Sequence, residues 1–269
     1  MARNLILSIL VISGLMWIIS CRKSVSEDFS NQPVVESYLL PGEKVTVKIS
    51  AESPYEVNAT SEKDINKLQV KIRYLGVWYS LIPMGDGVYK DTTGIIKIIP
   101  DSTYKLLFSY NNITISSSTI IPGKPTSVTQ SVTQVKIKQF DPDNPSWTQP
   151  PDPIKITFSN GDESYYFLTV ECMDSIKVPI FKDSIPDNDI LSSQPMIGTE
   201  IYIQPMSIRY FGKNRIVLYH INPEYSTFFM QQNSTSQDYQ EPPTNVVNGL
   251  GIFTGINTDT LYLSVVRKY

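Results

Sequence analysis

The sequence predicts a mainly β protein: an antiparallel sandwich of the immunoglobulin or fibronectin type, followed by a second β-rich unit with one short helix. Three observations support this prediction. Tyrosine, isoleucine, valine, threonine and serine are abundant, and the 19 prolines lie mostly at segment borders. Residues 68–74 alternate between apolar and polar side chains, which is the period of a half-buried strand and excludes a helix. Turn signals separate short segments of this kind at regular spacing.

Residues 1–20 have the features of a secretory signal peptide. Arg3 precedes an apolar run over 5–12, and a second apolar stretch ends at Ser20 and Cys21. The run is shorter than the roughly 20 residues that a membrane-spanning helix needs. The pattern Ile-Ile-Ser-Cys resembles the bacterial lipoprotein box, so we expect cleavage after Ser20 and lipidation of Cys21. The alternative is an ordinary secreted protein with a cysteine at the cut site. The polar residues 21–32 predict a lipidated tether.

Residues 33–123 predict the N-terminal β-sandwich. Pro41 and Gly42 suit the centre of a type II turn between strands at 34–38 and 45–49. Asn111 and Asn112 can supply the two positive-φ positions of a hairpin turn between strands at 104–110 and 113–121. Further strands are expected at 68–74, 77–82 and 95–99. The run Pro-Gly-Lys-Pro at 122–125 marks the border of this unit.

Residues 124–269 predict the second β-rich unit. Asn160 and Gly161 predict a hairpin between strands at 154–158 and 165–172. Other strands are expected at 135–140, 201–203, 207–211, 216–221 and 261–265. A helix is expected near 223–233, because Asn222 can cap it and Pro223 suits its first position. Its aromatic face is expected to pack in the core and consists of Tyr225, Phe228 and Phe229.

Charge and cysteine content limit the classes of binding partner and the disulfides that are possible. The net charge of −3 leaves no basic footprint, which argues against nucleic acid as a partner. With Cys21 lipidated, Cys172 is the second of two cysteines and no intramolecular disulfide forms. Because Cys172 lies in a strand-like run, we expect it to be a small buried hydrophobic residue.

Enzymatic chemistry finds little support in the sequence. His220 is the single histidine, which excludes metal sites built on several histidines, and no nucleophile-elbow sequence accompanies it. We therefore expect no catalytic residue, no metal and no cofactor, with a cryptic hydrolase using His220 as the distant alternative. The aspartate pairs 141/143 and 187/189 lack the spacing of a calcium loop; they predict turn residues, with weak calcium binding as the alternative.

Trp147 is the candidate contact for a ligand or partner. It lies in a polar, proline-rich loop, where strand alternation buries it less easily than Trp78, which has Tyr79 and Leu81 beside it. The alternative is that Trp147 folds back over the sandwich, since a large exposed apolar ring is unfavourable.

Several triplets resemble the acidic–hydroxyl–apolar sequence used for O-glycosylation in Bacteroidota. Each has an aspartate followed by a serine or threonine, a dipeptide that also opens turns well, so both explanations remain open. The candidate acceptors are Thr92, Ser102, Ser175, Ser184 and Thr260.

A glycine-rich stretch near the end contains Gly249, Gly251 and Gly255. These glycines predict positive φ or close backbone approach, as in a bulge or strand crossing. The alternative, a phosphate cradle, has the wrong spacing and no following lysine.

The order of these features resembles a Bacteroidota outer-membrane lipoprotein family known as domain of unknown function 4249. The shared features are Cys21 and the segments at 33–36, 41–42, 87–89, 119–122 and 248–253. The likeness covers nearly the whole chain after Cys21, and the Asn-Gly-Leu-Gly-Ile-Phe run at 248–253 is the distinctive part. The resemblance implies an envelope location beside a TonB-dependent outer-membrane transporter, with no assigned activity.

Together these observations predict a non-enzymatic binding or accessory protein, held at the outer membrane by lipid on Cys21 and facing the cell surface. A periplasm-facing position is the alternative orientation. The alternative of a different class is a structural or adhesive surface lipoprotein.

Overall fold

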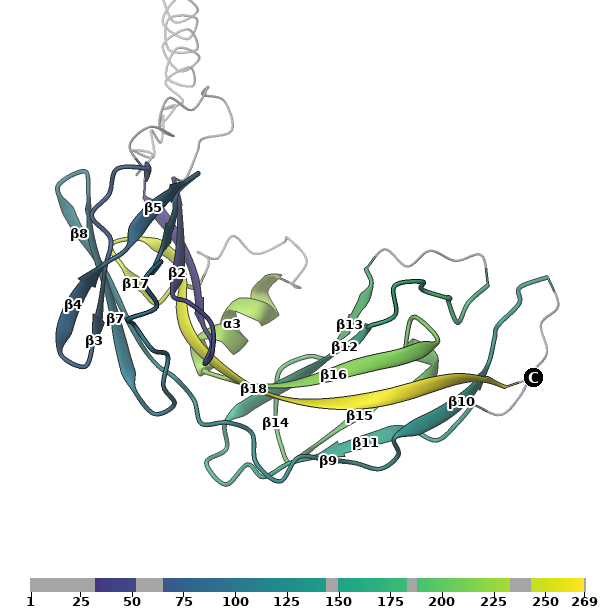
Figure 1. Ribbon diagram of the computed structural model, residues 1–269. Helices are drawn as coiled ribbons and strands as arrows, with labels where there is room; N and C mark the ends of the chain where they lie inside the picture. Colours follow the sequence, from purple (N-terminus) through teal and green to yellow (C-terminus); the bar gives the residue numbers. More distant parts are fainter. Residues whose placement is uncertain (1–31, 52–64, 144–149, 183–187, 233–242, 269) are drawn as a thin grey trace, which may run out of the picture. The chain divides into compact units, whose positions relative to one another are not determined.

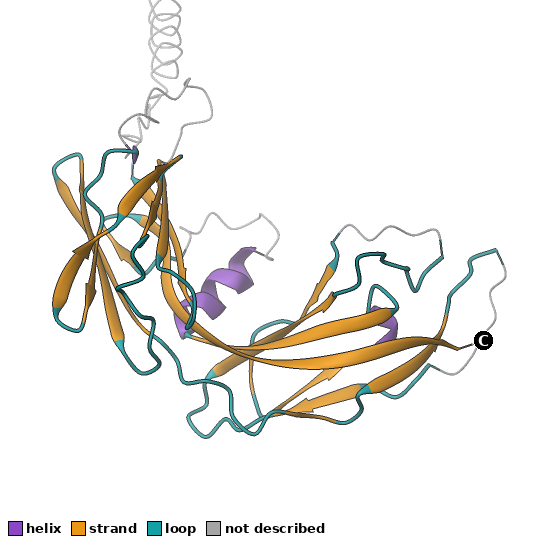
Figure 2. Cartoon of the chain, in the orientation of Figure 1, coloured by secondary structure: helices purple, strands orange, loops and turns teal. Residues whose placement is uncertain are grey.

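The computed structural model describes residues 32–51, 65–143, 150–182, 188–232 and 243–268. Strands dominate the described chain, and the predicted mainly β fold is confirmed (Figures 1 and 2). Residues Gln32–Tyr269 form one compact unit that contains two large hydrophobic cores. Among the described residues, no helix combines the length and apolarity needed to cross a bilayer.

The first core lies in an immunoglobulin-like sandwich. One sheet has the order β1-β2-β6-β5, and the opposing sheet has the order β17-β8-β7-β3-β4. This is the pairing of the immunoglobulin sandwich, with β1, β2, β6 and β5 against β3, β4, β7 and β8. The strands are β1 (Pro33–Leu39), β2 (Thr46–Ala51), β3 (Lys71–Tyr74), β4 (Val77–Ser80), β5 (Ile82–Gly85), β6 (Val88–Lys90), β7 (Thr103–Tyr110), β8 (Ile113–Ile120) and β17 (Val246–Val247).

Local sequence signals set the turns of this sandwich. Glu43 N donates to Leu40 O at 3.0 Å, and Gly42 has φ +91°, as a type II turn requires. Asn111 and Asn112 both have positive φ and join β7 to β8. Both turn predictions are confirmed.

A tyrosine fixes the corner that precedes β7. The Tyr104 hydroxyl donates to Lys97 O and accepts a hydrogen bond from Ile99 N at 2.9 Å. Immunoglobulin-like sandwiches use a tyrosine at this position to tie the strand back to the preceding loop. The predicted strand at 95–99 is absent because Tyr104 occupies the backbone groups that a ladder would use, although Ile96 and Ile98 still point into the core.

The second core lies between two further sheets. Strands β13 and β14 pair with β12, which continues through β16 to β18 and β10, and the facing sheet has the order β15-β11-β9. The elements are β9 (Thr129–Gln130), β10 (Gln134–Lys138), β11 (Ile154–Thr157), β12 (Tyr165–Cys172), β13 (Ile190–Ser192), β14 (Met196–Ile197), β15 (Glu200–Ile203), η1 (Pro205–Ser207), β16 (Gly212–Ile221), α3 (Pro223–Gln232) and β18 (Leu250–Lys268).

Strand β18 serves both sandwiches. Its first part pairs in parallel with β1, and its later part pairs with β16 and then with β10. Phe253 in β18 consequently belongs to the first core, as does Val246 in β17. Both residues follow most of the second core in sequence. The division at 123/124 stays a prediction, and residues 246–255 pack with the first sandwich.

Two local predictions for the second unit are wrong. Strands β11 and β12 do not pair with each other, because Asn160 folds the connecting loop through hydrogen bonds to Ser164 and the chain crosses between sheets. Residues 207–211 form no strand: η1 ends at Ser207, and β16 begins at Gly212. The expected closing strand at 261–265 is confirmed, and it belongs to the longer, 19-residue β18, in which Ile252 and Phe253 are buried on successive positions instead of alternating.

The expected helix is present as α3. The Asn222 side chain does not cap it; its Nδ2 donates instead to Ile120 O at 2.8 Å and to Thr119 Oγ1 at 3.0 Å. Tyr225 and Phe229 pack on Phe167 with ring centroids 5.7 and 5.8 Å away, so the aromatic face contacts the sheet and is half-buried.

Candidate functional site

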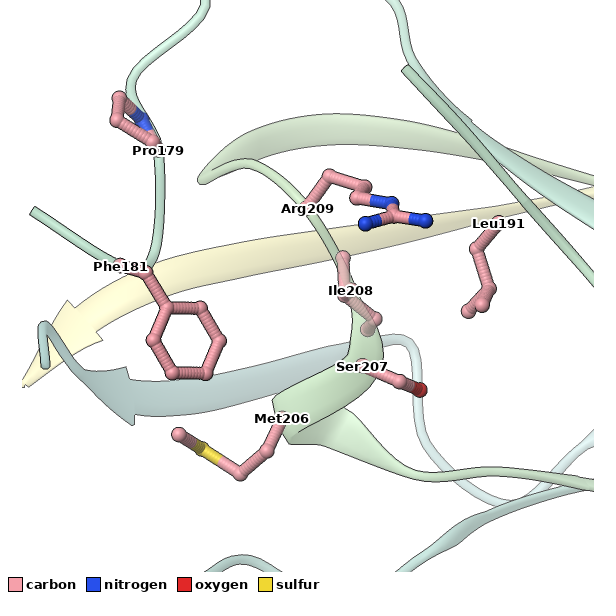
Figure 3. Close-up of a pocket in the computed structure, with 7 residues that line it drawn as sticks. All are labelled: Pro179, Phe181, Leu191, Met206, Ser207, Ile208 and Arg209. Atoms are coloured by element: carbon pink, nitrogen blue, oxygen red, sulfur yellow. The ribbon is translucent and has the colours of Figure 1, made fainter. Parts of the chain in front are cut away.

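A pocket of about 220 Å³ lies beside the second core (Figure 3). Its walls come from the segment before β16, from β13 and from the strand-like residues 178–182. Most of the lining is apolar, and one lining residue carries a charge. The lining residues are Pro179, Phe181, Leu191, Met206, Ser207, Ile208 and Arg209.

The wall at 178–182 is held on both sides by backbone hydrogen bonds. On one side, Phe140 N donates to Ile180 O at 2.9 Å, and Lys182 N donates to Phe140 O at 2.8 Å. On the other side, Ile180 N donates to Arg209 O at 3.0 Å. The rings of Phe140 and Phe181 are 5.3 Å apart. The wall at 178–182 therefore has the hydrogen bonding of a strand, although it is too short to form a regular one. This pairing positions Phe181 in the lining.

The opposite wall follows the 3-10 helix η1. Pro205 opens that helix, and Ser207 Oγ donates to Gln204 O at 2.7 Å, which occupies the hydroxyl within the turn. Ile208 is buried, while Met206 is half-buried and faces the pocket. Figure 3 shows the Arg209 guanidinium directed toward Leu191, with Phe181 and Met206 on the other side of Ile208.

Arg209 introduces a positive charge into this lining. Its Nε is buried and has no hydrogen-bond partner, and none of the ion pairs found among the described residues includes its guanidinium. Burying part of a charged group without an acceptor is unfavourable. A ligand that brings an acceptor to the guanidinium would remove that cost.

The acids near the pocket are already paired with other groups. Asp189 accepts hydrogen bonds from Lys177 and from the Tyr210 hydroxyl, each at 2.5 Å. The Lys177 ammonium, followed by that hydroxyl, holds the pKa of Asp189 below its ordinary value, and Asp189 in turn raises the pKa of Lys177. Asp141 accepts from Lys182 at 3.0 Å. Arg209 adds a smaller contribution to the lowered pKa of Asp189 through space, but no ion pair among the described residues joins the two side chains.

Exposed apolar side chains lie on the segments that form the pocket. Phe140 is 40% exposed and Phe181 is 39% exposed. Val178 and Ile190, next to the lining residues Pro179 and Leu191, are exposed as well. The pocket is thus continued by apolar surface at its walls, as is common where a protein binds a partner.

Three predicted site residues, Cys21, Trp147 and Ser184, lie outside the described residues. Trp78, which was expected to be the more easily buried tryptophan, is 41% exposed on the edge strand β4. Its exposure follows from the end position of β4, which leaves one side of the strand uncovered.

The other glycosylation candidates are far apart in the fold. Thr92 is exposed in the turn after β6, and Ser175 is exposed in the bend after β12. Ser102 is half-buried immediately before β7, and Thr260 is exposed in β18 opposite Val217. Their modification stays a prediction.

His220 and Cys172 are both buried, in surroundings typical of residues that stabilise the fold. His220 is 6% exposed, its Nδ1 lies 2.8 Å from Gly123 O, and its ring stacks on Tyr166 at 4.6 Å. Cys172 is a free, buried cysteine, as predicted. No group of three or more histidine, cysteine or acidic side chains that could hold a metal ion occurs in the part of the chain that the structure describes.

The pocket residues were not predicted from the sequence. Arg209 lies between the apolar residues Ile208 and Tyr210, a pattern typical of the solvent face of a strand. One available signal was Pro205, which lies between the strands expected at 201–203 and 207–211, since proline favours a helical turn over a strand ladder.

Similarity to known proteins supports the family and adds no activity. None of the curated proteins is similar enough to this chain to match it. The crystal structure of the FN1–FN3 domains of chicken CNTN1 aligns with 88% of this chain and 67% of that chain, at 11% identity and a TM-score of 0.27. The family model described as "Domain of unknown function (DUF4249)" matches residues 23–261. The chain therefore belongs to the DUF4249 family.

Proposed function

We propose that this protein is a non-enzymatic binding or accessory protein of the cell envelope, held at the outer membrane by lipid on Cys21, on the cell surface and beside a TonB-dependent transporter. The observation that carries the binding role is the mainly apolar pocket lined by Arg209, whose buried Nε has no hydrogen-bond partner. The signal-peptide pattern ending at Cys21 supports the location.

The arrangement favours binding over catalysis. Apart from Arg209, the charged side chains near lining residues in the sequence, Lys177, Lys182 and Asp189, are engaged in ion pairs. Ser207 uses its hydroxyl within η1, and His220 is packed against Tyr166 elsewhere. A binding site needs apolar area and one orienting polar group, and this pocket supplies both.

A structural or adhesive role is the second candidate, and a specific observation favours it. Strands β4 and β5 are the end strands of their sheets, and both carry exposed apolar side chains. Such edges can pair with another chain. The exposed fractions are 53% for Val77, 41% for Trp78, 48% for Ile82 and 58% for Met84.

A pull-down from native membranes in mild detergent distinguishes these roles. The tagged wild-type chain is compared with Phe181→Ala at the pocket and with Trp78→Ala at the β4 edge, two aromatic residues with matched exposures of 39% and 41%. We expect a TonB-dependent transporter, identified by mass spectrometry, with wild type and Trp78→Ala, and much less of it with Phe181→Ala. Loss only with Trp78→Ala favours the adhesive role, and absence of any transporter contradicts the proposal.

A further inference from the structure

Arg209, which precedes β16, and Arg215, which lies in β16, differ in the hydrogen bonds that their guanidinium groups make. Arg215 also has a buried, unpartnered Nε, but its Nη2 donates to Glu171 Oε2 at 2.7 Å. No hydrogen bond or ion pair joins Arg209 to a carboxylate among the described residues; Asp189 acts on Arg209 only through space and hydrogen-bonds Lys177 and Tyr210 instead. The Arg209 guanidinium therefore lacks the direct hydrogen bond to a carboxylate that Arg215 has in Glu171.

The size of the pocket limits the apolar part of a ligand. A volume of about 220 Å³ is smaller than the roughly 300–1,000 Å³ of typical small-molecule sites. It accommodates one branched or aromatic side chain against Phe181, Met206 and Leu191. The thioether of Met206 adapts to the shape of the group that enters.

We propose that this pocket binds a carboxylate carried on a small branched or aromatic apolar group, as at the carboxyl end of a peptide, with the carboxylate on Arg209. This inference rests on the proposed binding function and names its ligand class. The apolar group fills the space between Phe181 and Leu191, and the carboxylate accepts hydrogen bonds from the Nη atoms of the guanidinium. The ligand thereby supplies the hydrogen-bonded carboxylate that Glu171 supplies to Arg215.

A sheet edge next to the pocket, which no further strand covers within the described ranges, favours a peptide as the source of the carboxylate. Leu191 lies in β13, the end strand of its sheet. β13 pairs with β12 on one side. An extended peptide can add to such an edge through main-chain hydrogen bonds while its last side chain enters a pocket. A free organic acid has the same carboxylate and apolar group without these main-chain contacts.

The test measures binding of N-acetyl-leucine and N-acetyl-leucinamide to the purified full chain in detergent by calorimetry. Hydrogen bonds to a charged group are worth enough to predict about tenfold or stronger binding of the acid over the amide. The wild type and Arg215→Gln, a variant with the same loss of charge outside the pocket, should keep this preference. Arg209→Met, which retains apolar packing, should lose it.

A second measurement needs no substitution at Arg209. In the chain labelled with 13C-methyl methionine, N-acetyl-leucine should shift the Met206 signal, assigned with Met206→Leu, and leave that of the exposed Met84 unchanged. Comparison with 4-methylpentanoate identifies the source: tighter binding of the acetylated amino acid supports a peptide end, and equal binding supports a free acid. Equal affinity of wild type for acid and amide, or an unchanged Met206 signal, overturns the inference. Because purified protein is used, that failure is separate from loss of transporter in the pull-down.

Discussion

Gly251 and Val35 are register partners in the parallel pairing of β18 with β1, and their backbones touch so closely that no side chain fits at Gly251. A Cβ there would lie 2.0 Å from Val35 O, and the residue has φ +91°. The positive φ and close approach predicted for this stretch are both present at Gly251. The contact brings β18, whose later part pairs in the second sandwich, onto the first strand of the first one.

We predict that Gly251→Ala lowers the free energy of unfolding by at least about 2 kcal/mol, because the new methyl group meets backbone and the φ is strained. Urea denaturation measures the change as a lower midpoint. Gly161→Ala is the control, since a Cβ at Gly161 has no atom within 4 Å. Equal midpoints for the two variants would show that the Gly251 contact is not needed.

Replacing Tyr104 with phenylalanine tests the corner before β7. The variant keeps the buried ring but leaves Lys97 O and Ile99 N without the hydroxyl. We expect a loss of about 1–3 kcal/mol in the free energy of unfolding. Tyr262→Phe, at a side chain that is 51% exposed, should change it by less than about 0.5 kcal/mol. A Tyr104→Phe variant as stable as wild type would show that the Tyr104 hydroxyl does not stabilise the loop before β7.

The lowered pKa of Asp91 predicts that its contribution to the free energy of unfolding depends on pH. Burial raises the pKa of this carboxyl, but hydrogen bonds from Thr93, Ile96 and Gly94 outweigh burial and bring the pKa below its ordinary value. A lowered folded-state pKa means that the stabilisation is complete above the ordinary carboxyl pKa. It is lost as the pH falls through the folded-state pKa.

Asp91→Asn should therefore lower the free energy of unfolding by about 1–3 kcal/mol at pH 7 and by less in acid. Urea titrations of wild type and variant across that pH range measure the difference. Asp152→Asn, at an exposed carboxylate, serves as the control. A gap between wild type and Asp91→Asn that stays constant with pH would argue against the carboxylate as its cause.

Thiol chemistry tests the two cysteines together. Cys172 is 5% exposed, so a lipidated chain should show no fast reaction with Ellman's reagent while folded. After denaturation in guanidinium, the Cys172 thiol alone should react, and Cys172→Ala should remain unreactive. A fast-reacting thiol in the folded wild type would indicate that Cys21 is bare.

Local patterns predicted the first sandwich well because its strands follow the pleat. Val70, Ile72 and Tyr74 are buried in alternation with polar neighbours, and the Asn111–Asn112 turn has the φ values that its sequence favours. Strand β18 was missed over most of its length. Its residues from Gly251 to Asn257 are buried in succession, so no alternation marks them, and their glycines resemble loop residues.

The candidate site escaped prediction because its residues are brought together by tertiary structure. Phe181, Leu191 and Arg209 come from separate segments, each short or irregular, and none is adjacent in the sequence to a recognisable motif. Asp189 pairs with Lys177 and acts on Arg209 only through space, an arrangement that depends on the positions of three separate segments. Sequence periodicity carries no information on such pairings.

The anchor at Cys21 is the claim on which the proposed location depends, and mass spectrometry of the wild-type protein purified from its native host tests it most directly. We expect a mature chain whose first residue is Cys21 and whose N-terminal peptide carries fatty acyl groups, with residues 1–20 absent. A bare Cys21 thiol, or a finished chain that retains residues 1–20, would contradict it.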